Sequence, residues 1–319
     1  MATSQPPRKH HFAPVFYLNR WTGADGQIEQ FHAPHGRVVR ARRLHPAATG
    51  FKTDLYALPG LAADLMQQIE SKFMQTVDSR AAAVLARMED GHEPTDRATR
   101  SDWTRFLQSL QLRTPSDIVG LKDRVRADWG LTVPEIQTRY EALREDGDPE
   151  TFEAFIEARD PLLVERIGVR LATVLIDHPG LGERINNMEW DILDLERSNI
   201  ALLTSDHAVD RVLGLKEPRA FITLPIGPKR LFIAANERRT IDALAARNPR
   251  DVVMHRNRTT VKCALDYVWA QDRAQAAFIG ANMGAVPVRR LSERLAADPA
   301  SPGAVQDEAA TPPLEAAVS

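Results

Sequence analysis

Cysteine is almost absent from this sequence, since Cys263 is the single one among 319 residues. No disulfide can form within the chain, which favours a reducing compartment such as the cytoplasm. Long apolar runs are also missing. The longest, residues 161–178, contains Glu165, Arg166 and Arg170, and three charges in hydrocarbon are too costly for a membrane span. The first eleven residues lack the apolar core of a signal peptide. We therefore expect a soluble, cytoplasmic protein with no membrane partner.

Signatures of cofactor-dependent proteins are lacking as well. No G-x-x-x-x-G-K-[ST] segment is present, which argues against a phosphate-binding loop for nucleotides. His32 and His35 flank a predicted loop at a spacing that could hold a metal. Two ligands do not make a site, and the single cysteine gives no help. The sequence therefore predicts neither a cofactor nor a metal.

The chain has no overall surplus of positive charge, because 41 Lys and Arg residues face 43 Asp and Glu residues. The charges are nevertheless uneven. Residues 1–56 hold eight basic side chains against three acidic ones, residues 229–262 hold nine against three, and residues 141–160 hold two against eight. The basic stretches could form a surface for nucleic acid or another anionic ligand. The alternative is a set of solvated faces whose charges cancel locally.

What is present is typical of a globular protein, with 43% hydrophobic and 26% charged residues. Near the N-terminus, residues 15–18 form an aromatic β-type run. Residues 27–32 and 37–43 resemble the two strands of a hairpin, and residues 51–58 are extended. Residues 11–58 are therefore predicted to form an N-terminal antiparallel β-hairpin element.

The middle of the chain, residues 61–178, has helical periodicity. Apolar residues recur every three or four positions from Leu61 to Met88, as in a helix of roughly seven turns. A second apolar stripe runs from Ser101 to Pro115, where the proline ends the helix, and Gln111 lies on this stripe. Further helices are predicted from Pro115 with a cap at Ser116 or Asp117, over 134–144, over 151–158, and over 162–176 as the most buried helix.

The pattern changes again in residues 188–283, where short apolar runs favour strands. Strands are predicted over residues 190–195, 200–204, 220–224, 231–235 and 275–283. A long helix is expected over residues 249–270. Residues 1–10 are predicted to be flexible, and residues 285–319 to be a disordered or partly helical tail. Together these patterns predict an α+β fold in one domain over residues 11–284: an N-terminal antiparallel β-hairpin element, a helical middle, and a C-terminal β-sheet with a long helix.

The order of several motifs resembles a known family. His11-x-x-Pro14-x-x-Tyr17-Leu18-x-x-Trp21 resembles the opening motif of a bacterial family called domain of unknown function 4238, which usually has Phe or Trp at the last position. Further blocks are similar and occur in the same order: Phe51-Lys52 with Asp54-Leu55-Tyr56, Glu70, Phe106-Leu107 with Gln111 and Arg113-Thr114-Pro115, Thr204-Ser205-Asp206, Leu224-Pro225-Ile226, and Asn257. The resemblance covers about residues 11–282. It implies a single domain and no particular activity. The family often has proline two residues after the aspartate, where this chain has Ala208.

The predicted catalytic residues are His11, Asp206 and Glu70. His11 could act as a general base, since its ordinary pKa lies near neutrality, or it could anchor the start of the chain to the backbone. Asp206 follows a predicted strand and could take part in acid–base chemistry or bond its own turn. It is not part of a triad with its sequence neighbours, because adjacent strand residues point to opposite faces. Glu70 could be a solvated helix flank or a buried partner of Arg113.

Six residues are predicted to bind substrate. Lys52 and Tyr56 could hold an anion and stack on it, or the lysine stem could cover a core tyrosine. Arg113 could clamp a phosphate or cap its own helix. Gln111 could contact a ligand or be a hydrogen-bonded structural amide. The remaining two are Ser205 and Asn257.

Three hypotheses follow from these residue types. The first is an enzyme that acts on an anionic, phosphate-bearing substrate such as nucleic acid, as a nuclease-like or toxin-like effector. The second is a module that binds an anion or a nucleic acid without turnover. The third is a structural or partner-binding protein whose motif residues only maintain the fold.

Overall fold

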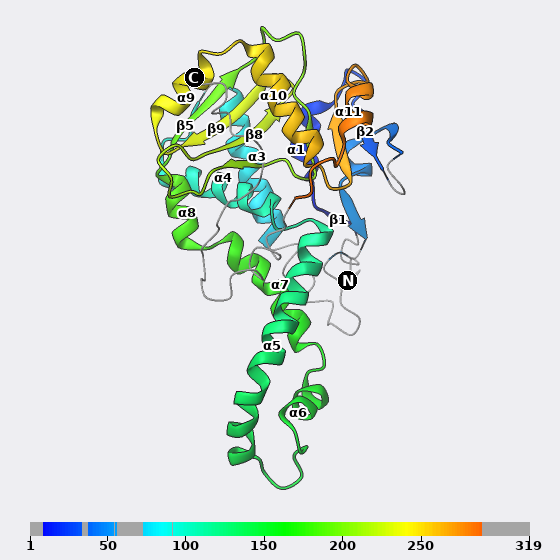
Figure 1. Cartoon of the computed structure of the whole chain (residues 1–319), viewed down its shortest axis with the longest axis vertical. Helices are drawn as coiled ribbons and strands as arrows, with labels where there is room; N and C mark the ends of the chain where they lie inside the picture. Colours follow the sequence, from blue (N-terminus) through cyan, green and yellow to red (C-terminus); the bar gives the residue numbers. More distant parts are fainter. Residues whose placement is uncertain (1–8, 34–37, 54, 56–72, 91, 289–319) are drawn as a thin grey trace, which may run out of the picture.

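The protein has an α+β fold with antiparallel sheets and helices (Figure 1). Its structure is a computed structural model that describes residues 9–33, 38–53, 55, 73–90 and 92–288. Glu70, Tyr56 and His35 lie outside the described residues, as do the start of the predicted helix from Leu61 and most of the predicted tail.

The chain begins with a two-stranded ribbon. β1 (Lys9–His11) pairs antiparallel with β4 (Phe51–Thr53), so that His11 lies opposite Phe51. Gly50 fixes the entry to this ribbon. Its φ of +63° is in the left-handed region, its carbonyl accepts the N–H groups of Phe12 and Ala13, and a Cβ at this position would lie 2.9 Å from that of Ala13. Glycine is therefore required at this close approach. The short 3-10 helix η2 (Pro46–Ala48) precedes it.

A second sheet combines strands from the N-terminal and C-terminal parts of the chain, in the order β3-β2-β10-β6. β2 (Ile28–His32) and β3 (Arg40–Leu44) pair antiparallel, which confirms the predicted N-terminal strand pair. β10 (Tyr267–Ala270) lies between β2 and β6 (Thr204–Ser205). Residues more than 200 positions apart therefore share one sheet.

The third sheet has the order β5-β9-β8-β7 and is covered on both faces. Its strands are β5 (Glu189–Asp194), β9 (Arg230–Ala235), β8 (Phe221–Gly227) and β7 (Asp210–Val212). On one face, side chains such as Ile233 pack against α9 (Arg238–Ala245) and α10 (Pro249–Lys262). On the other, Trp190 and Phe232 pack against the helices of the main core. Since both faces are buried, every residue of β8 is buried.

The main core is built around α4 (Arg97–Leu110), which confirms the helix predicted to end before Pro115. Its residues Trp103, Phe106 and Leu107 have no exposed side-chain surface. α3 (Gln75–Glu89) and α8 (Pro179–Asn186) contact α4 on different sides. The Asp96 side chain caps the N-terminus of α4 by accepting the N–H of Thr99.

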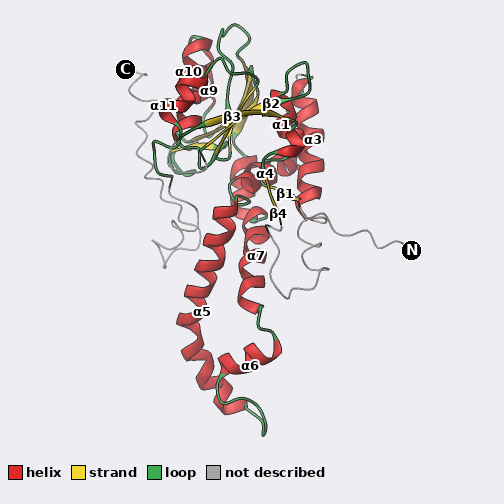
Figure 2. Ribbon diagram, turned by 90° about the vertical axis from the view of Figure 1, so that its right-hand side faces the viewer, coloured by secondary structure: helices red, strands yellow, loops and turns green. Residues whose placement is uncertain are grey.

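A helical arm extends away from the core, as Figure 2 shows. It consists of α5 (Pro115–Leu143), α6 (Phe152–Arg159) and α7 (Leu163–Ile176), with α7 packed along α5 and α6 near the far end (Figures 1 and 2). No helix of the described segments is long and apolar enough to cross a membrane.

Three predictions about the arm are wrong. Pro134 does not start a new helix, because α5 continues through it, supported by packing against α7 and α6. The cap of α5 is Thr114, whose hydroxyl accepts the N–H of Asp117 at 3.2 Å. α7 is not the most buried helix. Because the arm projects into solvent, Ile167 is 39% exposed and Val174 is 55% exposed.

The prediction of a strand at residues 15–18 is wrong as well. Val15–Leu18 forms helix α1, followed by the 3-10 helix η1 (Asn19–Trp21). The helical spacing brings Tyr17 and Trp21 onto one buried face, with ring centroids 5.2 Å apart. Packing of these two large rings outweighs the strand preference of a short aromatic run.

Three predictions in the C-terminal part are also corrected. The helix expected over 249–270 ends at Lys262. Cys263 and Ala264 still donate to helix carbonyls, and the amide groups of Leu265, Asp266 and Tyr267 then bond the Asp206 carboxylate, which turns the chain into β10. Residues 275–283 form helix α11 (Ala276–Asn282) rather than a strand, with Ile279 buried against its neighbours. In the run 200–204 only Thr204 belongs to a strand, since backbone groups of Ala201 and Leu203 bond to Asn257 instead of a neighbouring strand.

Candidate functional site

The His11 imidazole is the predicted site residue with the most open chemistry. It is half-buried at the end of β1, and its Nε2 atom is buried without a hydrogen-bond partner. Burial lowers the pKa of His11 below its ordinary value, and a hydrogen bond to the backbone of Ala47 opposes this shift. The lowered pKa favours the neutral ring at pH 7, and its Nε2 is a buried nitrogen without a partner.

A lysine and an aromatic ring lie beside His11 on one face of the β1–β4 ribbon. Phe51 lies with its ring centroid 5.5 Å from that of His11, and the Nζ of Lys9 is 4.7 Å from the centre of the Phe51 ring. Lys9 is close enough to lower the pKa of His11. Lys52 is exposed on β4 and lies opposite His10, so it belongs to the other face of the ribbon.

Arg113 lies among the helices of the core, within electrostatic range of the His11 imidazole. Its guanidinium is fully buried and donates to both carboxylate oxygens of Asp78, at 2.8 Å and 3.1 Å. It also donates to the hydroxyl of Ser109. Asp78 raises and Arg113 lowers the pKa of His11, so the ion pair lies within electrostatic range of the imidazole. Because the Arg113 guanidinium already binds the Asp78 carboxylate, the geometry favours a structural role for Arg113 over binding of a substrate.

Asp78 is a residue that the sequence prediction missed. It lies on α3, one position after the buried Val77. Like Glu70, it directly follows an apolar residue of the stripe predicted from Leu61 to Met88. A flanking carboxylate is ordinarily solvated, and only the fold reveals that a buried arginine faces this one.

Gln111 has a local partner. It is the C-terminal cap residue of α4, and its side-chain amide donates to the carbonyl of Leu107 at 3.0 Å. The amide thus satisfies one of the carbonyls that a helix end leaves open.

Asp206 lies in a different environment from His11. It is buried, and its carboxylate accepts three backbone N–H groups, from Leu265, Asp266 and Tyr267, at 2.6–3.0 Å. Burial raises the pKa of Asp206 to about 7, although each of these hydrogen bonds lowers it. All three donors belong to the segment that leads from α10 into β10. The contacts of Asp206 therefore hold a chain reversal.

Ser205 and Asn257 belong to the same region. The Ser205 hydroxyl accepts the N–H of His207 at 3.2 Å. Asn257 accepts the N–H of Leu203 at 2.9 Å and donates to Ala201 at 2.8 Å, which fastens α10 to the strand entry. The structure thus brings His11, Lys52 and Arg113 to the β1–β4 side, and Asp206, Ser205 and Asn257 to the β6–α10 side.

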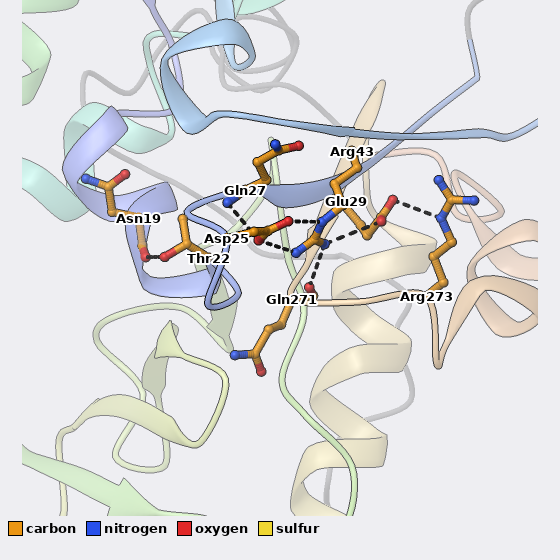
Figure 3. Close-up of polar contacts among 8 residues, drawn as sticks. All are labelled: Asn19, Thr22, Asp25, Gln27, Glu29, Arg43, Gln271 and Arg273. Atoms are coloured by element: carbon orange, nitrogen blue, oxygen red, sulfur yellow. Dashed lines mark hydrogen bonds and ion pairs between the residues drawn. The ribbon is translucent and has the colours of Figure 1, made fainter.

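A further polar cluster lies at the edge of the second sheet (Figure 3). Arg43 donates to both oxygens of Asp25, at 2.7 Å and 2.6 Å, and also bonds the buried Glu29. Arg273 donates to the other oxygen of Glu29 at 3.1 Å. Arg43 holds the pKa of Asp25 down at about 2. Because each carboxylate is paired with arginine, the cluster ties β2 and β3 to the segment after β10.

The described residues contain no group of three or more His, Cys, Asp or Glu side chains that could hold a metal ion. His32 instead stacks on Tyr267, with ring centroids 4.4 Å apart and planes inclined by 8°.

Comparison with known proteins gives one match. A family model described as "Protein of unknown function (DUF4238)" matches residues 9–274. No curated protein and no solved structure matches the chain. The family match begins at the ribbon that carries His11 and includes both groups of predicted site residues.

Proposed function

The chain belongs to the DUF4238 family, and because that family's description names no activity, we propose a function from the β1–β4 ribbon: an enzyme in which His11 acts as general base on an anionic, phosphate-bearing substrate. The observation that carries the proposal is the buried Nε2 of His11, which has no partner on a ring whose pKa is lowered. A neutral imidazole with a free nitrogen can accept a proton at pH 7.

Lys9 and Lys52 supply the preference for an anion. Both are exposed on the ribbon: Lys9 lies two residues before His11 on the same face, and Lys52 lies opposite His10 on the other face. The ion pair of Arg113 with Asp78 lies within electrostatic range of the imidazole. Tyr56 and Glu70 lie outside the described residues and remain predicted members of this site.

The alternative with a specific observation behind it is binding without turnover. Asp206, the second predicted acid–base group, already accepts three backbone N–H groups. A site with one imidazole and two lysines, and no second proton-transfer group, suits recognition of a phosphate. The enzyme hypothesis and the binding hypothesis therefore share a ligand class, and they differ in whether the bound ligand is cleaved.

The test measures binding and turnover separately. The purified chain is assayed with single-stranded RNA, single-stranded DNA and bis(p-nitrophenyl) phosphate, and RNA binding is followed by fluorescence anisotropy. His11→Gln should lower turnover by about a hundredfold or more and leave binding within a few fold. Lys52→Ala should weaken binding and reduce its salt dependence. His92→Gln, at an exposed histidine, is the matched control.

Each alternative has its own outcome. Binding without turnover in the wild type, weakened by Lys52→Ala, supports the binding module. Full activity in His11→Gln would show that His11 is not the general base. Absence of both binding and turnover would leave the motif residues as determinants of the fold, as in the third hypothesis.

A further inference from the structure

A pocket lies between β7, β8 and β9 of the third sheet and helices α9 and α10. Its enclosed cavity is small, about 20 Å³, and the whole hollow with open solvent included is about 360 Å³. The apolar part of its wall comes from the sheet and from both helices: Phe221, Leu231, Leu244 and Val252. These side chains are all buried, at 9% exposure or less. The pocket therefore has an apolar wall fixed by the core of the sheet.

Arg256 is the notable polar residue of this wall. Its side chain is 3% exposed, and no carboxylate of the described residues lies within ion-pair distance of it. One terminal nitrogen donates to Thr260 Oγ1 at 2.7 Å, and the other donates to the carbonyl of Ala208. Its Nε is buried without a partner. A buried guanidinium held only by neutral acceptors is unfavourable, and it attracts an anion.

Thr223 provides a second unsatisfied polar group in the same wall. It lies on β8, directly opposite Asp210 of β7, and is 3% exposed. Its hydroxyl is buried without a hydrogen-bond partner. Buried polar groups are nearly always bonded, so two unpartnered ones in one pocket call for an explanation. Both can donate a hydrogen bond, one from the Nε–H of Arg256 and one from the hydroxyl of Thr223.

The charges around the pocket restrict the ligand further. Arg247 and His255 line it together with Asp210 and Asp251. Asp210 is near enough to Arg256 to raise its pKa, against the lowering caused by burial. His255 is faced by Asp210, Arg256, Arg247 and Arg258, and burial lowers its pKa. The two carboxylates balance the two guanidinium groups, so the lining has no surplus positive charge to offset the greater dehydration cost of a doubly charged anion.

We infer that this pocket binds a small organic carboxylate, whose two oxygens accept from Arg256 and Thr223 and whose apolar body lies against Phe221, Leu231, Leu244 and Val252. A single negative charge supplies the counter-ion that Arg256 lacks. An apolar body fits the wall better than a compact phosphate does. Because both donor atoms are buried, the carboxylate reaches them after a small displacement of a lining side chain. This site is independent of His11 and of the proposed activity.

The experiment uses the full chain and three probes. Isobutyrate is the small carboxylate, isobutyramide is its neutral counterpart of the same shape, and inorganic phosphate is the multiply charged anion. Binding is measured by isothermal titration calorimetry and by the shift in melting temperature. Isobutyrate should bind saturably and raise the melting temperature, and isobutyramide should bind at least tenfold more weakly, because it carries no charge for Arg256.

Two variants locate the site. Thr223→Val keeps the shape of the side chain and removes its hydroxyl, so it should weaken isobutyrate binding by about fivefold to tenfold. Arg256→Lys keeps the charge and serves as a second variant if its fold, checked by circular dichroism, is intact. Arg258→Gln removes an exposed charge from the same helix outside the pocket lining and should change binding by less than about twofold.

Several results would overturn the inference. Equal binding of isobutyramide and isobutyrate would remove the role of charge. Tighter binding of phosphate would reject the organic carboxylate as the ligand class. The proposed site would be rejected if a folded Thr223→Val variant bound isobutyrate unchanged. It would also be rejected if isobutyrate showed no saturable binding at about 10 mM.

Discussion

Asp78 and Arg113 form a two-pronged ion pair between α3 and the end of α4, in which the guanidinium is completely buried and the carboxylate side chain is 24% exposed. The pair lies within electrostatic range of the His11 imidazole, and both of its charges affect the pKa of His11. It therefore connects the stability of the helical core with the electrostatics of the candidate site.

Removal of the carboxylate should be strongly destabilising. Asp78→Ala leaves the Arg113 charge buried without this partner, and we expect the free energy of unfolding to fall by about 3 kcal/mol. Urea denaturation followed by circular dichroism measures this loss. Arg80→Ala is the matched control on the same helix. Its ion pair with Asp102 is exposed, so its loss should be below about 1 kcal/mol. Similar losses in the two variants would show that burial of Arg113 adds nothing to the pair.

Asn257 should act as a structural fastener rather than a ligand contact. Asn257→Ala leaves the N–H of Leu203 without its acceptor, and we expect a loss of about 2 kcal/mol in the free energy of unfolding. Asn257→Asp should be at least as damaging, because a carboxylate would then face the carbonyl of Ala201 and the side-chain oxygen of Gln275. Asn282→Ala, which removes one local bond within α11, is the control. If Asn257→Ala weakens RNA or anion binding while stability is unchanged, Asn257 is a ligand contact after all.

Pro134 should limit the stability of the arm. It lies inside α5, is exposed, and lacks the N–H that would bond the carbonyl four residues earlier. Pro134→Ala should increase amide protection in hydrogen exchange over residues 130–143, by roughly 1–3 kcal/mol in local opening free energy. Pro115→Ala, at the first position of the same helix, should change protection little, because that N–H has no partner within the helix. Decreased protection in Pro134→Ala would mean that the proline stabilises the arm by restricting the unfolded chain.

Local sequence patterns predicted the fold wherever a helix stripe or a hairpin turn was unambiguous. The helix before Pro115 and the strands predicted at residues 220–224 and 231–235, which form β8 and β9, are examples. The patterns failed where distant partners decide the structure. α10 does not continue to residue 270, because Asp206, more than 50 residues earlier, accepts the amide groups of Leu265 and Asp266. No local signal in residues 263–270 reveals that contact.

The candidate site was predictable in part for the same reason. His11 and Arg113 were identified by residue type and by their order in the chain, and they do lie within electrostatic range of each other. Asp78 and Arg256 were missed, since a flanking carboxylate and an arginine in a basic stretch are ordinarily solvated. The pairing of Asp78 with Arg113 and the burial of Arg256 depend on how α3 and α10 pack, which requires the three-dimensional structure.

Asp206 should make stability depend on pH in a direction opposite to that of an ordinary paired carboxylate. Its pKa is raised to about 7 in the folded chain, whereas an unfolded aspartate titrates near 3.9. Below about pH 4 both states hold the proton, and between about pH 4 and pH 7 only the folded state holds it. The free energy of unfolding should therefore fall as pH rises through this window and level off above it. Asp206→Asn cannot titrate, so the difference in stability between wild type and Asp206→Asn, measured by urea denaturation at pH 4.5 and pH 7.5, isolates this group from the histidines. We expect the wild type to lose stability relative to the variant as pH rises. The opposite change would mean that the three backbone N–H donors outweigh burial and hold Asp206 as an anion throughout.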